Sequence, residues 1–331
     1  MARSSQHLDE DDVRIRPGRT KARRRTKDRP DFSQSRPATV LTVDRGRFTL
    51  ATEQGEEFAV KARELGRKGV VVGDHVHVVA QEPGSLDNPV RIVLRDPRTT
   101  ELRRTADDQD PVERVIVANA DTMGIVVATK DPEPRIGLID RSVVAALDAG
   151  ITPWLIVTKA DLASTQPLAE LYGPLGIPFF EVTRGEVTDE LRQALIGRTT
   201  VLVGHSGVGK STLVNALIPE AQRTTGVVNA VTGRGRHTST SAYAFPYLPS
   251  RAQRAGVIID TPGIRSFGLA HVSAERILGA FPELAEETQA CPRNCSHDEV
   301  DCALNAAVGD DRRSARIDSL RRLLRSRTAA N

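Results

Sequence analysis

The chain has 331 residues, 39% of them hydrophobic, and this length fits two or three domains with their own cores. Its 46 Lys and Arg nearly balance its 43 Asp and Glu, so the net charge of +3 excludes a chain that is basic throughout. No run approaches the roughly eighteen apolar residues of a membrane span and the N-terminus lacks a signal-like apolar core, so we expect a soluble, cytoplasmic monomer without membrane contact.

The first residues, 1–37, form an arm without apolar periodicity. Residues 1–36 hold eleven Lys or Arg against six Asp or Glu, and we expect disorder because the arm cannot bury enough apolar surface. From residue 38 to 98, segments such as GVVVGDHVHVVAQE alternate apolar and polar residues between Gly and Pro. Five short strands in this stretch predict an OB-like barrel.

After a linker around RTADDQDPVE, residues 112–268 alternate between strand and helix patterns. We expect strands at RVIVA, TMGIVVAT, PWLIVTK, IPFFEVT, TTVLVG and AGVIID, and helices at LIDRSVVAALDAG, DELRQALIG and KSTLVNALIP. This alternation predicts a mostly parallel sheet covered by helices on both faces. Residues 269–331 are expected to form a helical domain, from AERILGAFPELAEE through a cysteine cluster to DRRSARIDSLRRLLRSR.

The most specific motif is GHSGVGKS, which fits GxxxxGK[ST] between an apolar strand and a helical pattern. Its glycines let backbone N–H groups point inward, Lys210 reaches the outer phosphates, and the Ser211 hydroxyl can ligate Mg²⁺. The sequence therefore predicts a phosphate-binding loop, although the loop does not identify the base. Its candidate residues are Gly204, His205, Ser206, Gly207, Val208, Gly209, Lys210, Ser211 and Thr212.

An earlier motif concerns the base. Thr158, Lys159, Ala160 and Asp161 close the strand PWLIVTK and resemble the NKxD element of GTP-binding proteins, whose Asp accepts hydrogen bonds from two guanine N–H groups. Asp161 would then select guanine over adenine. A simpler alternative is that Asp161 caps the following helix, in which case an ATPase stays open.

Two later segments resemble the switches of GTP-binding proteins. Asp260-Thr261-Pro262-Gly263 closes a strand and resembles DxxG, in which Asp260 would reach Mg²⁺ through water and the Gly263 N–H would meet the γ-phosphate. RGRHTSTS lies before it and resembles the first switch, with hydroxyls at Thr238, Ser239 and Thr240. The motif order is base, phosphate loop, first switch, second switch, which predicts a circularly permuted domain, since domain termini often lie close together.

The three cysteines of the chain fall within twelve residues, and a histidine lies among them. Three thiolates and one imidazole make a closed tetrahedral set without a position for water, so Cys291, Cys295, His297 and Cys302 predict a structural site for one Zn²⁺. The alternative is that the cysteines are ordinary buried side chains and His297 an ordinary surface residue.

A permuted GTPase domain, a preceding OB-like barrel and a following cysteine–histidine cluster together resemble the RsgA (YjeQ) family of bacterial small-ribosomal-subunit-dependent GTPases. VVGDHV, VANAD and GRGRHTST also match, so the resemblance covers roughly residues 38–325. The chain departs from the family pattern at Thr158, where Asn is usual, in HTST instead of HTTT, and in cysteine-cluster gaps that are each one residue shorter.

Hydrolysis requires a group that positions water. The residue after DTPG is Ile264, whose apolar side chain cannot do so, and the resemblance supports His237 in the first switch instead. A solvated loop histidine remains the alternative. The resemblance implies GTP hydrolysis to GDP, with Mg²⁺, coupled to docking on and release from the maturing small (30S) subunit and stimulated by it. The rival hypothesis is a zinc-containing RNA-binding module that only senses GTP.

Three features favour contact with ribosomal RNA: the basic arm, the OB-like barrel and the basic last helix. Lys and Arg contribute a salt-sensitive term that does not depend on sequence. Phe48 and Phe58 are the only aromatic residues of the predicted barrel, so base stacking is expected to be minor. A basic helix is equally often just a solvated face.

Overall fold

The computed structural model describes residues 34–66, 69–79, 84–105, 113–219, 221, 242–248, 255–261, 267, 272–306 and 311–328. From Ser35 onward the chain forms one compact unit. Among the described helices, none combines the length and the apolar character that a membrane span requires. The expected disorder of the arm concerns residues that lie almost wholly outside these ranges.

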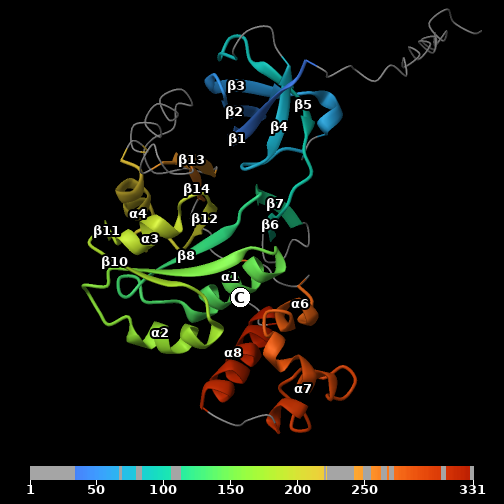
Figure 1. Ribbon diagram of the computed structural model, residues 1–331, viewed down its shortest axis with the longest axis vertical. Helices are drawn as coiled ribbons and strands as arrows, with labels where there is room; N and C mark the ends of the chain where they lie inside the picture. Colours follow the sequence, from blue (N-terminus) through green and yellow to red (C-terminus); the bar gives the residue numbers. More distant parts are fainter. Residues whose placement is uncertain are drawn as a thin grey trace, which may run out of the picture. The chain divides into compact units, whose positions relative to one another are not determined.

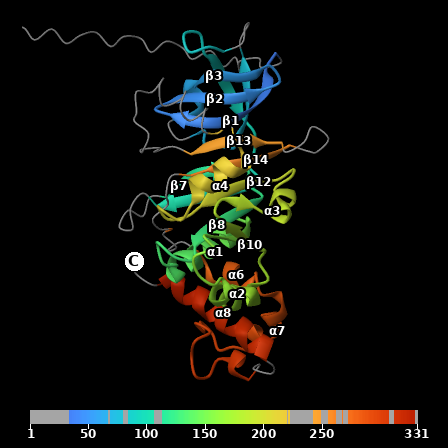
Figure 2. The same cartoon turned by 90° about the vertical axis from the view of Figure 1, so that its left-hand side faces the viewer.

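Five strands close into a barrel, which confirms the OB-like prediction. They are β1 (Arg36–Asp44), β2 (Arg47–Thr52), β3 (Gly55–Lys61), β4 (His75–Val79) and β5 (Val90–Arg95), with the 3-10 helix η2 (Arg63–Leu65) after β3. The pairing order is β1-β2-β3-β5-β4, and β4 pairs back with β1. Figure 2 shows β3, β2 and β1 in succession above β13. Because alternate side chains of each strand point inward, Val40, Leu50, Val76 and Ile92 fill the interior.

Strands flank the expected linker, of which residues 106–112 lie outside the described ranges. Strand β6 (Glu101–Thr105) pairs antiparallel with β7 (Glu113–Ala118) as a separate two-stranded sheet. RVIVA was therefore assigned to the wrong sheet, since β7 does not join the parallel strands. An apolar run predicts a strand without saying which partner it takes.

The parallel sheet carries the order β11-β10-β9-β8-β12-β14-β13, and β13 also pairs with β1 of the barrel. Strands β8, β9, β10, β12 and β14 run parallel, as predicted, while β11 and β13 are antiparallel additions that the sequence analysis did not include. Their bounds are β8 Thr122–Ala128, β9 Thr152–Thr158, β10 Phe179–Thr183, β11 Glu186–Val187, β12 Thr199–Val203, β13 Tyr243–Tyr247 and β14 Gly256–Asp260.

Helices cover both faces of this sheet (Figure 1). Side chains of β8 alternate between the faces, so Met123 and Ile125 join one core and Val126 joins the other. The first core includes α1 (Ile136–Asp148) and α2 (Gln166–Tyr172), and the second includes α3 (Asp189–Ala194) and α4 (Lys210–Leu217). The 3-10 helix η3 (Gly173–Leu175) follows α2.

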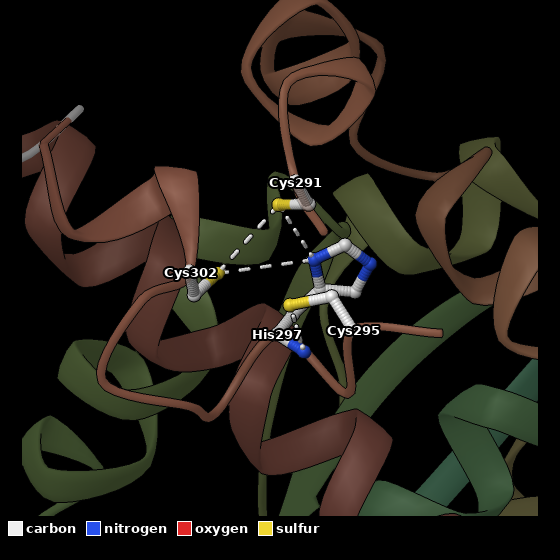
Figure 3. Close-up of side chains that lie close together, drawn as sticks. All are labelled: Cys291, Cys295, His297 and Cys302. Atoms are coloured by element: carbon white, nitrogen blue, oxygen red, sulfur yellow. Dashed lines mark hydrogen bonds between the residues drawn. The ribbon is translucent and has the colours of Figure 1, made fainter. Parts of the chain in front are cut away.

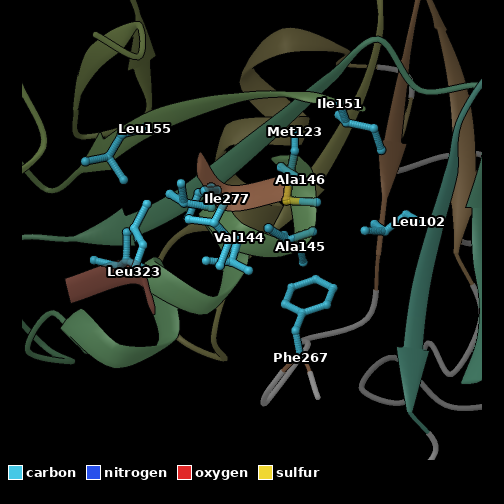
Figure 4. Packing of buried hydrophobic residues seen from close by; sticks show 14 of the residues in the cluster. Leu102, Met123, Val144, Ala145, Ala146, Ile151, Leu155, Phe267, Ile277 and Leu323 are labelled. Carbon is cyan, nitrogen blue, oxygen red and sulfur yellow. The ribbon is translucent and has the colours of Figure 1, made fainter. Parts of the chain in front are cut away.

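The C-terminal helices share the first core. Leu323 and Ile277 pack there with Val144 of α1 and with Phe267, which is 1% exposed (Figure 4). The expected helix AERILGAFPELAEE is broken, because Pro282 lacks an N–H donor and disfavours helical backbone in the residue before it. The elements are α6 (Ala274–Leu278), η4 (Pro282–Leu284), α7 (Ala285–Gln289), η5 (Ala303–Asn305) and α8 (Asp311–Thr328).

Candidate functional site

The GHSGVGKS segment forms the expected strand–loop–helix unit between β12 and α4. Gly204 passes so close to β8 that an added Cβ would lie 2.6 Å from the Val126 carbonyl oxygen. Gly209 caps α4 with a φ of 88°, which a residue with a side chain rarely adopts. The N-terminus of α4 therefore opens directly onto the loop, where an anion gains from the free N–H groups and the helix dipole.

Lys210 is the buried cation of this loop, with 9% of the residue exposed. Its Nζ donates hydrogen bonds to the carboxylate of Asp260 and to the carbonyl of Thr261. Asp260 ends β14, which runs parallel to β12, so the two motifs meet at the carboxyl edge of adjacent strands. Ser211, one residue after Lys210, is exposed and open to a ligand.

The TKAD segment reaches the phosphate loop through Thr158. This residue ends β9 and is 4% exposed, and its hydroxyl donates to the Val208 carbonyl of the phosphate loop. The same oxygen lies 3.1 Å from the Val127 carbonyl of β8. The hydroxyl therefore links the TKAD segment, here called the base loop, to the phosphate loop. The family usually has Asn at this position.

Lys159 and Asp161 of TKAD line an open cleft of about 290 Å³, together with Gly209 and with Thr212 of α4. Lys159 has a φ of 55° and donates from Nζ to the Asp131 carbonyl. Asp161 lies in the cleft wall. Partial burial raises the pKa of Asp161, but its own N–H and the N–H and guanidinium of Arg184 outweigh this and leave the pKa below its ordinary value. The carboxylate is therefore ionised and able to accept hydrogen bonds at neutral pH.

The structure thus brings together Thr158, Asp161, the phosphate loop and Asp260 at one edge of the sheet. The predicted catalytic His237, the hydroxyl residues 238–240, and Gly263 lie outside the described residues. Sequence reasoning missed the two-residue turn Arg184–Gly185, which lines the same cleft. Its signal was available, because carboxyl ends of parallel strands share one edge and the turn directly follows the expected strand IPFFEVT.

The four predicted metal ligands converge, and their ligand atoms all lie within 4.8 Å of one another (Figure 3). Cys291 Sγ lies 3.8 Å from Cys302 Sγ and 3.5 Å from His297 Nδ1. A tetrahedral Zn²⁺ with ordinary bond lengths separates two sulfurs by about 3.8 Å, and sulfur from nitrogen by about 3.6 Å. The cluster is therefore compatible with one zinc ion, bound by His297 through Nδ1.

Helix α8 holds the loop that carries these ligands. Arg321 donates from Nε to the His297 carbonyl at 2.8 Å, and Arg325 pairs with Asp298 at 2.7 Å. Arg313 and Arg316 of the same helix pair with Glu287 and Glu283. These four arginines therefore serve contacts within the protein, which weakens the basic helix as an argument for RNA binding.

Most of the chain is similar to one protein family. The RsgA GTPase family model matches residues 95–270. A small ribosomal subunit biogenesis GTPase RsgA from Pseudomonas fluorescens is 42% identical over 246 residues, which cover 71% of this chain and 69% of that protein. The protein of the same name from Pseudomonas aeruginosa is 43% identical, with 71% and 70% covered.

Two solved structures share the fold. YjeQ from Thermotoga maritima aligns with a TM-score of 0.62 at 24% identity, covering 88% of this chain and 99% of its own. YloQ, described as a circularly permuted GTPase, aligns with a TM-score of 0.58 at 21% identity, covering 92% and 100%. The permuted motif order is therefore a property of the fold.

Proposed function

The chain belongs to the RsgA GTPase family and is a GTP hydrolase, and we propose that it acts in late maturation of the small (30S) ribosomal subunit. In this proposal it binds the subunit and its rRNA as a monomer in the cytoplasm. The subunit stimulates hydrolysis, and hydrolysis is coupled to release. The name of the Pseudomonas relatives, small ribosomal subunit biogenesis GTPase, supports the choice of partner.

The observation that carries the proposal is the meeting of three motif loops at one sheet edge. Lys210 and the loop N–H groups would bind the phosphates, and Ser211 and Asp260 would hold Mg²⁺, which when bound supplies positive charge beside the phosphate oxygens. Asp161 accepts the guanine N–H groups. Lys210 is already held beside Asp260, so the loop is preorganised for a phosphate and its cation.

For catalysis we propose His237 as the residue that orients the attacking water. Ile264 stands where Ras-like proteins carry Gln, so the chain has to supply another polar group. We expect His237→Ala to lower subunit-stimulated turnover while nucleotide affinity stays nearly unchanged.

Zinc in the Cys291–Cys302 cluster would be structural, because three thiolates and an imidazole leave no position for a reacting water. It would fix the loop that α8 grips through Arg321. RNA contact is assigned to the barrel and the basic arm, because Arg313, Arg316, Arg321 and Arg325 of α8 bind groups of the same chain.

Coupling between the two sites is supported by Phe267. This residue follows the DTPG segment by a few positions and is buried in the core that α1 shares with α6 and α8. A γ-phosphate that fixes the segment after Asp260 would therefore favour one position of the C-terminal helices that carry the cysteine cluster, here called the zinc domain. By linkage, a subunit that prefers this arrangement tightens GTP binding by the same factor.

The test combines phosphate release with co-sedimentation on purified 30S subunits. We expect slow hydrolysis by the free protein, strong stimulation by subunits, and tighter subunit binding with a non-hydrolysable GTP analogue than with GDP. Equal binding in both nucleotide states and unaltered turnover would favour the GTP-sensing RNA-binding module instead.

A further inference from the structure

The turn that joins β10 to β11 has an unusual first residue. Arg184 and Gly185 have φ values of 51° and 79°, and Thr183 pairs with Glu186 across them, which is the pattern of a type I′ hairpin turn. Such turns favour Asn, Asp or Gly at the first position, because a side chain with positive φ is strained. An arginine is therefore held in a conformation that its own backbone disfavours.

This turn forms one wall of the cleft beside the phosphate loop. A Cβ added to Gly185 would lie 3.0 Å from Thr212 Cγ2, so the turn packs against the first turn of α4. Arg184 and Gly185 line the same cleft as Asp161. Three elements therefore meet here: the base loop, the hairpin turn and the helix that follows the phosphate loop.

Within the cleft, Arg184 points its charge at the base loop. Its Nε donates to Asp161 Oδ2 at 3.3 Å, although 81% of the arginine side chain is exposed and only 21% of the Asp161 side chain is. The carboxylate that is expected to receive two guanine N–H groups thus already has a cationic donor in the nucleotide-free protein.

We propose that Arg184 sets the affinity for guanine nucleotides by serving as the counter-ion of Asp161 in the empty pocket and yielding it when guanine binds. This inference rests on the base-reading role proposed for Asp161. Guanine needs both oxygens of the carboxylate, so binding weakens the ion pair and returns the guanidinium to water. Because an exposed ion pair contributes little, the effect on affinity is a small factor, about two- to fivefold.

The location of the Arg184–Asp161 pair predicts how the affinities for GTP and GDP change when the pair is removed. The Arg184–Asp161 pair acts at the base end of the nucleotide. Its removal therefore raises the affinity for GTP and for GDP by the same factor, and the ratio of the two affinities stays constant. Salt screens an exposed pair, so the gain disappears at high ionic strength.

The experiment measures GDP and GTP-analogue affinity of the full chain by fluorescence titration, at low and at high salt. Arg184→Ala and Arg184→Gln are expected to bind both nucleotides about two- to fivefold more tightly at low salt. Arg45→Ala is the matched control, because Arg45 and Gly46 form the equivalent Arg-Gly turn in the barrel, with φ values of 47° and 86°. Alanine keeps a Cβ at positive φ, so both Arg→Ala changes leave the backbone strain in place. Arg45→Ala should leave nucleotide affinity unchanged.

Weaker or unchanged binding in both Arg184 variants, with thermal stability intact, overturns the inference, since the arginine then holds the base or has no role. An Asp161→Asn background separates the two assignments. If Asp161→Asn keeps the preference for guanine over adenine, the base-reading role fails. If it loses that preference but Arg184→Ala still tightens binding in this background, only the Arg184 inference fails.

Discussion

Arg322 of α8 donates from Nε to both carboxylate oxygens of Asp140 on α1, at 3.1 Å each. Asp140 is 2% exposed and also accepts a hydrogen bond from the Tyr172 hydroxyl at 2.9 Å. The Arg322 guanidinium lies over the Tyr172 ring and donates to the Leu171 carbonyl. The C-terminal segment that carries the cysteine cluster is thus fastened to the GTPase helices by a largely buried charge pair.

The first prediction removes the cation of this pair. Burial raises the pKa of Asp140, and Arg322 and Tyr172 only partly offset this, so the carboxylate depends on its partners to stay charged. Arg322→Met should lower the free energy of unfolding by about 3 kcal/mol, because it leaves a buried carboxylate without its cation. Urea unfolding at neutral pH measures this loss.

Its control is Arg325→Met on the same helix. Arg325 pairs with Asp298, but 62% and 41% of the two side chains are exposed, so the loss should stay below about 1 kcal/mol. Equal losses in the two variants would show that Arg322 acts through ordinary surface charge.

A second prediction concerns acid stability of the barrel. Glu57 is 2% exposed and accepts from Arg36, the Gly84 N–H and the Thr52 hydroxyl. The hydrogen bonds from Arg36 lower the pKa of Glu57 from 4.5 to about 2. Burial opposes this shift, and the other two donors add to it. Because its pKa is lower in the folded state, the Glu57 carboxylate stabilises the fold fully above pH 4.5. This contribution of about 3 kcal/mol is lost as the pH falls toward 2.

Urea unfolding between about pH 5 and pH 2.5, a range that covers most of this loss, tests the assignment. The native protein should lose stability steeply, and Glu57→Gln should be less stable at pH 5 and change less with pH. Glu56→Gln alters the exposed neighbour and should follow the native curve. Parallel curves for Glu57→Gln and the native protein would contradict the role given to Glu57.

A third prediction concerns the cysteine cluster. Cys295→Ser should abolish the one bound zinc and remove hydrogen-exchange protection from the segment around Cys291 and Cys302, because a structural metal contributes its folding free energy locally. Protection of α4 should persist. Elemental analysis and exchange mass spectrometry measure the two effects, with exposed Ser296→Ala as the control. Native protein purified without chelator but lacking zinc would refute the assignment.

Motifs made of consecutive residues were predictable from the sequence, whereas contacts between distant residues were not. GHSGVGKS and the cysteine cluster carry their geometry within a few residues, because one loop wraps one ligand. Arg322 shows the limit: the sequence predicts a basic helix, but its partner Asp140 lies 182 positions earlier, and only the fold brings them together. Charge alone therefore suggested RNA where the structure has an internal ion pair.

The pairing partners of the strands were equally impossible to predict from the sequence. RVIVA has the apolar character of a buried parallel strand. It nevertheless pairs antiparallel with β6, opposite residues that include Leu102 and Arg103, and the apolar pattern alone does not identify this partner. The break at Pro282 did have a signal, since proline inside a helical pattern ends it at the preceding residue. The Arg184 turn was missed because no motif covers it, although its position directly after the expected strand IPFFEVT was a signal.

The last prediction concerns Thr158, whose hydroxyl is the donor that links the base loop to the Val208 carbonyl of the phosphate loop. Thr158→Val keeps the shape of the side chain but removes the donor, leaving a buried carbonyl unpaired at a cost of about 1–3 kcal/mol. If about half of this falls on the loop that binds phosphate, GTP and GDP should each bind about two- to tenfold more weakly. Thr158→Ser retains the hydroxyl and should bind nearly as the native protein does. Fluorescence titration distinguishes the two, and this change runs in the opposite direction from Arg184→Ala, so a general loss of folding cannot produce both results. Native affinity in the Val variant would mean that the phosphate loop keeps its shape without this hydrogen bond.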